Sequence, residues 1–123
     1  MEQTLVLLKP DAITLELTPV IGAAMRQAGL TLVYEKSMQL DKAFMLRWRD
    51  FPYYDEQFWV HVAFETSAPI IAQVWQGPNA VATGLAVKKA MRTQYSASVT
   101  HNVMHSPDNF EEAKREIALF FPK

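Results

Sequence analysis

The feature that most constrains the fold is an uninterrupted apolar run, Thr4 to Leu8, which ends abruptly at Lys9-Pro10-Asp11. A short run of this kind, without polar alternation, is typical of a buried strand. The run therefore predicts a strand in the core of the protein, close to the N-terminus. A chain of 123 residues can build one such core but not two, so we expect a single domain over residues 1–123.

The residues after this strand predict a helix and then a second strand. Thr18 followed by Pro19 indicates a helix start, because the missing N–H of proline costs nothing at the first helical position. Apolar residues then recur with a helical period until Gly29, which is expected to end the helix in a left-handed conformation. The segment 30–40 is rich in strand-forming residues and predicts a strand.

The remaining elements follow from turn residues and apolar periodicity. They are a short helix capped by Asp41 and ending near Arg49, a helix over Tyr54–Thr66, a strand over Ile70–Trp75, a helix from the Gly77-Pro78-Asn79 turn to about Met91, a short strand around Val103, and a last helix capped by Ser106 or Asp108. This order predicts an α+β fold, a ferredoxin-like split β-α-β sandwich with a four-stranded antiparallel sheet covered by helices. The fold hosts many functions and decides none of them.

Composition excludes several classes of function. The formal net charge of −1 excludes a generally basic surface that grips nucleic acid, so no nucleic-acid partner is expected. Without cysteine, the chain has no disulfide scaffold, thiolate nucleophile or zinc–cysteine site. The N-terminal segment, residues 1–9, has no basic leader and is too short to span a bilayer. We therefore expect a cytoplasmic protein with no membrane partner.

Two polar residues follow predicted strands and are candidates for chemistry. His105 follows a short strand, and a neutral imidazole is a good nucleophile near physiological pH. Glu116, on the following helix, could orient the ring through its second nitrogen. Lys9 projects from the end of the first strand. Taken alone, the histidine is more often structural and the lysine more often a solvated charge, so the spacing leaves both alternatives open.

Further candidates lie in a basic helix and in an aromatic segment. Arg92, with Lys88 and Lys89, could clamp phosphate oxygens, or could simply form a basic helix C-terminus. Most aromatic residues between 48 and 59 must belong to the core, but one or two could stack on a purine. The sequence contains no glycine-rich phosphate loop and no metal-ligand cluster. A phosphate ligand would therefore have to be held by side chains.

Taken together, four segments of the chain resemble the nucleoside diphosphate kinase family. They occur in the family's order and cover nearly the whole chain: residues 4–12, 67–77, 102–108 and 113–121. The resemblance implies ping-pong transfer of the γ-phosphate of a nucleoside triphosphate to a nucleoside diphosphate. It also implies a homo-oligomer, a dimer or a hexamer, and Mg²⁺ held mainly by the nucleotide phosphates.

The resemblance also implies a role for each candidate residue. His105 matches the histidine that becomes phosphorylated, and Glu116 matches the glutamate that orients its ring. Lys9 matches the lysine that contacts the phosphates and the ribose hydroxyl. Arg92 matches an arginine that neutralises phosphate charge, and Asn102 matches an asparagine that binds the sugar hydroxyl.

The chain also departs from the family pattern around the phosphates. Most of the long loop that covers them is missing after Lys89. The family's second arginine falls at Leu85, and Lys88 or Lys89 is the candidate substitute. Pro107 replaces a serine that helps hold the histidine, a task that Ser106 could take over. The base-stacking aromatic matches Phe58, with Tyr53 as the alternative. We expect an active enzyme with a weakened clamp.

Two other interpretations of the sequence compete with the kinase. The first is a catalytically weakened nucleotide-binding or regulatory module of the same fold, and the second is an oligomeric scaffold. A scaffold needs none of the five matched residues, and a mere binder does not need His105. The set as a whole therefore favours the enzyme.

Overall fold

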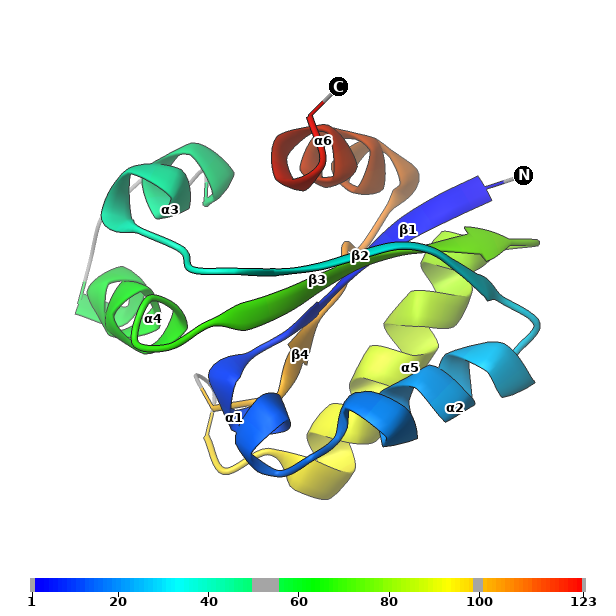
Figure 1. Ribbon diagram of the computed structural model, residues 1–123, viewed down its shortest axis with the longest axis horizontal. Helices are drawn as coiled ribbons and strands as arrows, with labels where there is room; N and C mark the ends of the chain where they lie inside the picture. The colour runs from blue at the N-terminus through cyan, green and yellow to red at the C-terminus, as the bar shows by residue number, and fades with distance from the viewer. Residues whose placement is uncertain (1, 50–55, 99–100, 123) are drawn as a thin grey trace.

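The computed structural model describes residues 2–49, 56–98 and 101–122, which form a four-stranded sheet with helices on both faces (Figure 1). In chain order the elements are β1 (Glu2–Leu8), α1 (Pro10–Thr14), α2 (Thr18–Gln27), β2 (Thr31–Met38), α3 (Lys42–Trp48), α4 (Glu56–Glu65), β3 (Ile70–Gly77), α5 (Ala80–Tyr95), β4 (Met104–His105) and α6 (Phe110–Phe120). The strand order is β2-β3-β1-β4, and all neighbouring strands are antiparallel. The predicted α+β sandwich is confirmed.

The first strand is central, as its apolar run indicates. β1 pairs with β3 along its whole length, from Glu2↔Gly77 to Leu8↔Ile71. Its other edge pairs with the short strand β4, where Leu7 lies opposite His105. Both faces of β1 are buried, which is why the run lacks polar alternation. Its C-terminal end therefore delivers Lys9 next to the strand that carries His105.

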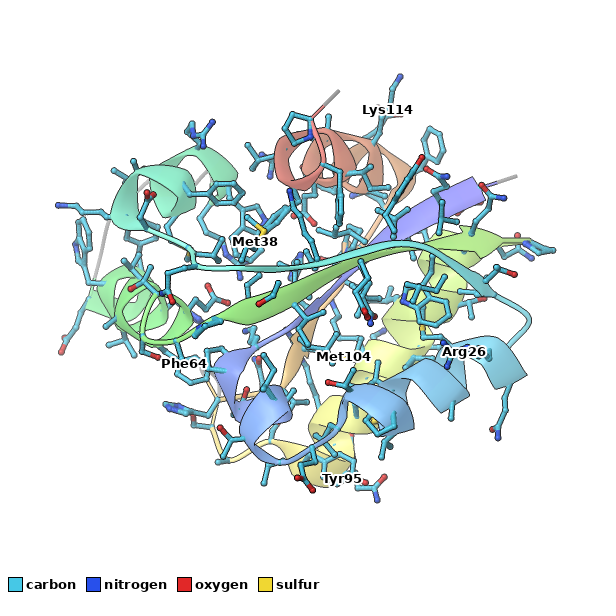
Figure 2. All side chains as sticks on the ribbon, viewed as in Figure 1. Arg26, Met38, Phe64, Tyr95, Met104 and Lys114 are labelled. Atoms are coloured by element: carbon cyan, nitrogen blue, oxygen red, sulfur yellow. The ribbon has the colours of Figure 1, made fainter. Side chains whose placement is uncertain are left out.

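The sheet separates two apolar cores. Leu8 and Met104 face the core formed with α1, α2 and α5, whereas Leu7 faces the core formed with α3, α4 and α6. Figure 2 shows Met104 and Met38 on opposite sides of the sheet. Because His105 is paired with Leu7, its side chain lies on the face covered by α3, α4 and α6. Its ring meets Trp48 of α3 edge to face, with ring centroids 5.1 Å apart.

The helix ends confirm some predicted caps and correct another. Gly29, just after α2, has a φ of 94°, and Asp41 caps α3 by accepting a hydrogen bond from the Phe44 N–H at 2.7 Å. The prediction that Ser106 or Asp108 caps the last helix is wrong. The cap is Asn109, whose Oδ1 accepts from the Glu112 N–H at 2.9 Å. Ser106 and Asp108 lie too far upstream, because α6 begins only at Phe110.

Two helices differ from the sequence-based expectation. The short helix α1 was not expected, and it starts at Pro10 in the favoured first position. α5 continues to Tyr95, beyond the expected end near Met91, so Arg92 lies within the helix. The predicted start of α4 at Tyr54 lies outside the described residues. The described part of this helix begins at Glu56. In the described part of the chain, every helix is too short or too polar to cross a membrane.

Candidate active site

A tight turn places His105 on the short strand β4. Val103 has a φ of 67°, and the Met104 N–H donates to the Asn102 carbonyl at 2.8 Å, which is the geometry of a γ-turn. The Val103 N–H donates to Asp11 Oδ2 at 3.1 Å, so the turn is fastened to the start of α1. A positive φ at a β-branched residue costs about 1–3 kcal/mol. The surrounding structure offsets this cost two residues before His105.

The His105 ring is held by a carboxylate that is itself held by an indole. His105 Nε2 lies 2.9 Å from Glu116 Oε1, and the Trp48 Nε1–H donates to Glu116 Oε2 at 3.0 Å. An ionised carboxylate only accepts hydrogen bonds, so Nε2 carries the proton and Nδ1 holds a lone pair. The predicted pairing of His105 with Glu116 is therefore present, and it makes Nδ1 the reactive nitrogen.

Burial sets the charge states of this pair. Desolvation lowers the pKa of His105 below its usual value, although the hydrogen bond and charge of Glu116 partly oppose the shift. Burial acts to raise the pKa of Glu116, but the contacts with His105 and Trp48 outweigh it and the net shift is downward. At neutral pH the ring is therefore neutral and the carboxylate ionised. This is the protonation state that a histidine nucleophile requires.

His105 opens on a cavity of about 330 Å³ with mixed charges around it. The cavity is lined by Trp48, Arg49, His105, Pro107, Asp108, Glu112, Arg115 and Glu116. The Arg115 guanidinium donates to the Trp48 carbonyl at 2.9 Å, which ties α6 to the end of α3. Arg49 stacks over the Trp48 ring, with its guanidinium carbon 3.8 Å from the ring centroid. Two guanidinium groups thus border the cavity that His105 lines.

Lys9 and Asn102 contact each other, and neither is among the residues that line this cavity. Lys9 Nζ donates to Asn102 Oδ1 at 2.7 Å, and Lys9 is only 2% exposed. Lys9 also forms an ion pair of 3.1 Å with Glu65 Oε1, at the end of α4. The same oxygen lies 3.2 Å from an Arg49 nitrogen. Arg49 and Glu65 therefore join the Lys9–Asn102 pair to the His105 cavity.

Sequence reasoning missed Arg49 and Glu65. Neither stands in a recognisable motif, and both lie at helix ends, where charged residues are usually solvated. One feature of the sequence could have indicated Glu65: it is a glutamate at the end of the aromatic-rich helix α4. A carboxylate buried there needs a cationic partner. The partners are Lys9 and Arg49, which sequence spacing does not connect.

The basic residues of α5 reach the outer edge of β4. Arg92 Nε donates to the Met104 carbonyl at 3.1 Å, next to His105 in the chain. Lys88 Nζ donates to the Ser106 carbonyl at 2.9 Å and to Asp108 Oδ1 at 3.1 Å. Lys89 is exposed, so of the two lysines only Lys88 is built into the site. Lys88 braces the turn that follows the histidine.

Other predicted residues are not brought to the cavity. Phe58 is 0% exposed and belongs to the core under α3, α4 and α6, so it presents no free face to a base in this conformation. The alternative, Tyr53, lies outside the described residues. Ser106 Oγ is buried and has no hydrogen-bond partner among the described residues, so it does not hold the imidazole. Base stacking by Phe58 or Tyr53 stays a prediction.

Comparison with known proteins finds relatives of one family over nearly the whole chain. Residues 2–123 match the family model described as nucleoside diphosphate kinase. The nucleoside diphosphate kinase of Gluconacetobacter diazotrophicus is 38% identical, over 98% of this chain and 93% of that protein. That of Persephonella marina is 35% identical, over 99% of this chain and 94% of that protein. The first alignment spans 134 positions against 123 residues here, so the relative carries residues that this chain lacks.

Solved structures agree with the sequence comparison. The nucleoside diphosphate kinase of Encephalitozoon cuniculi superposes with a TM-score of 0.90 at 27% identity, covering 100% of this chain and 90% of that one. The Aquifex aeolicus enzyme has a TM-score of 0.82 at 24% identity, covering 98% of this chain and 94% of that one, and supports the fold. The family resemblance read from the sequence is confirmed. This chain belongs to the nucleoside diphosphate kinase family of phosphotransferases.

Proposed function

We propose that this chain transfers the γ-phosphate of a nucleoside triphosphate to a nucleoside diphosphate through a phosphohistidine at His105. The observation that carries the proposal is the imidazole whose Nε2 is bound to Glu116, 2.9 Å away, and which lines an open cavity bordered by arginine side chains. A neutral nitrogen held in one orientation is the nucleophile that such a transfer needs. Family membership gives the reaction class.

In the first half-reaction the Nδ1 lone pair of His105 attacks the γ-phosphorus. The bond from that phosphorus to the β–γ bridging oxygen breaks, and the nucleoside diphosphate leaves with the electron pair. The ring gains positive charge as the N–P bond forms, and Glu116 stabilises it through the Nε2–H. In the second half-reaction a terminal oxygen of another diphosphate attacks the same phosphorus and restores the neutral ring.

Cationic side chains would neutralise the phosphate oxygens during both steps. We assign this role to Lys9 and Arg92, as the resemblance implies, and add Arg49 because it lines the His105 cavity. Arg49 would offset the loss of the arginine that is replaced by Leu85. Asn102, which holds Lys9 at 2.7 Å, is proposed to bind the sugar hydroxyl. Each such contact is worth several kcal/mol to a transition state whose charge lies on equatorial oxygens.

Mg²⁺ is the proposed metal, and the donor set fits an ion that arrives with the nucleotide. Among the described residues no group of three or more histidine, aspartate or glutamate side chains could hold a metal ion. Magnesium in kinases is commonly held by substrate phosphates with only one or two carboxylates. Asp108, whose side chain is exposed beside the cavity, is the carboxylate we propose as its protein contact. The ion supplies charge neutralisation on the phosphate oxygens.

The remaining assignments are also proposals. We propose that residues 1–123 work as one domain, that the chain forms a dimer or a hexamer, and that it acts in the cytoplasm on nucleoside triphosphates and diphosphates. The competing interpretation, a catalytically weakened binding module, has no need of a neutral imidazole with a free nitrogen. Among the described residues, no contact in the site favours it over the enzyme.

Initial-rate kinetics test the function. With ATP as donor and GDP as acceptor, GTP formation should give parallel double-reciprocal lines, the signature of a ping-pong enzyme. His105→Ala should reduce the rate to background, whereas the control His101→Ala, at an exposed histidine, should retain it. Converging lines, or an active His105 variant, would contradict a phosphohistidine intermediate.

A further inference from the structure

The carboxylate of Glu65 connects Lys9 with Arg49, which lines the His105 cavity. Its Oε1 lies 3.1 Å from Lys9 Nζ and 3.2 Å from an Arg49 nitrogen. Glu65 is the last residue of α4 and is 1% exposed, so neither ion pair is a surface contact. A carboxylate shared in this way holds the ammonium and the guanidinium close to each other.

The charges around Lys9 explain why a carboxylate is needed there. Burial lowers the pKa of Lys9, and the positive charges of Arg49 and Arg92 lower it further, while Glu65 opposes the shift. His61, the other titratable group near Glu65, has its pKa lowered mainly by burial and is neutral at physiological pH. Among the described residues, the charged groups that act most strongly on Lys9 are therefore two cations, Arg49 and Arg92, and the carboxylate of Glu65.

The family roles account for Lys9 but not for Glu65. Lys9 also donates to Asn102 Oδ1, but this neutral acceptor does not compensate the charge of the buried ammonium group, which Glu65 does. Glu65 Oε2 has no hydrogen-bond partner among the described residues. The carboxylate contacts both cations, Lys9 and Arg49, through Oε1. A helix tether alone would not require both cations on one oxygen.

We propose that Glu65 is a positioning residue, which holds Lys9 and Arg49 as a charged pair ready to bind the phosphates of the incoming nucleotide. This inference rests on the proposed function, because it assigns the pair to nucleotide phosphates. Without the carboxylate, Lys9 and Arg49 repel each other, and Lys9 loses its proton more readily. The nucleotide would then meet a clamp with less charge and poorer alignment.

The kinetic test compares Glu65→Gln with Glu56→Gln, at the exposed first residue of the same helix. We measure kcat and KM for the nucleotides between pH 6 and 10. Glu65→Gln should raise KM, and the loss in kcat/KM relative to the unmodified protein should grow to about tenfold or more on the alkaline side, because a neighbouring carboxylate favours the charged lysine. Glu65→Asp should recover part of the lost kcat/KM, and Glu56→Gln should have the same kcat/KM as the unmodified protein at each pH. A loss that is the same at every pH would overturn the proposal.

A second measurement does not depend on activity. The lysine side chains are labelled with ¹³C, and the Lys9 resonance is assigned by its absence in Lys9→Met. In Glu65→Gln, or in Glu65→Asp if the first variant does not fold, the titration of Lys9 should move to lower pH. An unmoved titration would overturn the inference even in an active enzyme. A moved titration in a protein without kinase activity would refute the proposed function but leave the hold of Glu65 on Lys9 established.

Discussion

His105 and Glu116 form a hydrogen-bonded pair in which the carboxylate fixes which ring nitrogen is free. The 2.9 Å contact joins Nε2 to Glu116 Oε1, so Nδ1 is the nitrogen with a lone pair. Burial keeps the pKa of the His105 ring low. An ionised carboxylate forms a stronger hydrogen bond with the Nε2–H than a neutral acceptor would. The pair thus combines a neutral nucleophile with a carboxylate ready to stabilise the charge that develops on it.

Replacing the carboxylate tests this pairing. In Glu116→Gln we expect kcat to fall about 10–100-fold, by analogy with the loss when the carboxylate that orients a metal-bound histidine is removed. Because Glu116 raises the pKa of His105 against the effect of burial, its loss should lower that pKa further. The acid limb of the pH–rate profile should therefore move to lower pH. An acid limb that stays in place, or moves to higher pH, would contradict the assigned geometry.

The indole of Trp48 supports Glu116 from the other side. Trp48→Phe removes the 3.0 Å hydrogen bond to Oε2 and leaves that buried oxygen with the longer, 3.9 Å ion pair to Arg115, which costs about 1–3 kcal/mol. Unfolding in urea should show this loss, together with a several-fold fall in kcat. Trp59→Phe, at an exposed indole, is the control and should change neither quantity appreciably. Equal effects of the two substitutions would argue against a role for Trp48 in the site.

Lys88 and Lys89 offer a matched comparison between adjacent residues of α5. Lys88→Met removes the contacts to the Ser106 carbonyl and to Asp108, which brace the turn after His105. We expect a loss of about 1–2 kcal/mol in the free energy of unfolding, since one contact is buried and Asp108 is exposed. The turnover number should fall with it. Lys89→Met, at an exposed side chain, should leave both unchanged, and a similar loss there would refute the bracing role.

The folded protein should become less stable as the pH falls below neutrality. The folded-state pKa of His105 lies below 6.5, so the unfolded chain binds a proton there that the folded chain does not, and stability is lost as pH drops through this window. Glu65 and Glu116 have folded-state pKa values below 4.5, which adds a second loss at lower pH. Urea midpoints at pH 7, 5.5 and 4 should decrease in that order. A constant midpoint would show that these groups are not shifted.

The architecture was predictable because each element has a local signal. The apolar run before Lys9 predicted the central strand, and Gly29 and Asp41 marked helix ends with a defined stereochemical reason. Pro19 indicated the right helix, but it occupies the second helical position and not the expected first, because α2 begins at Thr18. The cap of α6 was misplaced because Ser106, Asp108 and Asn109 are all good capping residues, and only the backbone geometry selects among them.

The site was predictable only where one side chain follows a strand or belongs to a motif. The predicted pairing of His105 with Glu116 is present in the structure, whereas the contact of Lys9 with Asn102 was not predicted. Arg49 and Glu65 were missed because their contacts join helix ends to a distant strand, and no periodicity encodes that proximity. Phe58 was matched by sequence register alone, which does not report that its ring is fully buried.

The most direct test of the account is the chemistry of His105 itself. The protein is mixed with γ-labelled ATP and Mg²⁺ without an acceptor, and the protein-bound phosphate is tested for acid lability. We predict acid-labile label on His105, which GDP discharges as GTP, no label in His105→Ala, and weaker label in Lys9→Ala. Label that survives in the His105 variant, or that GDP cannot discharge, would contradict the account.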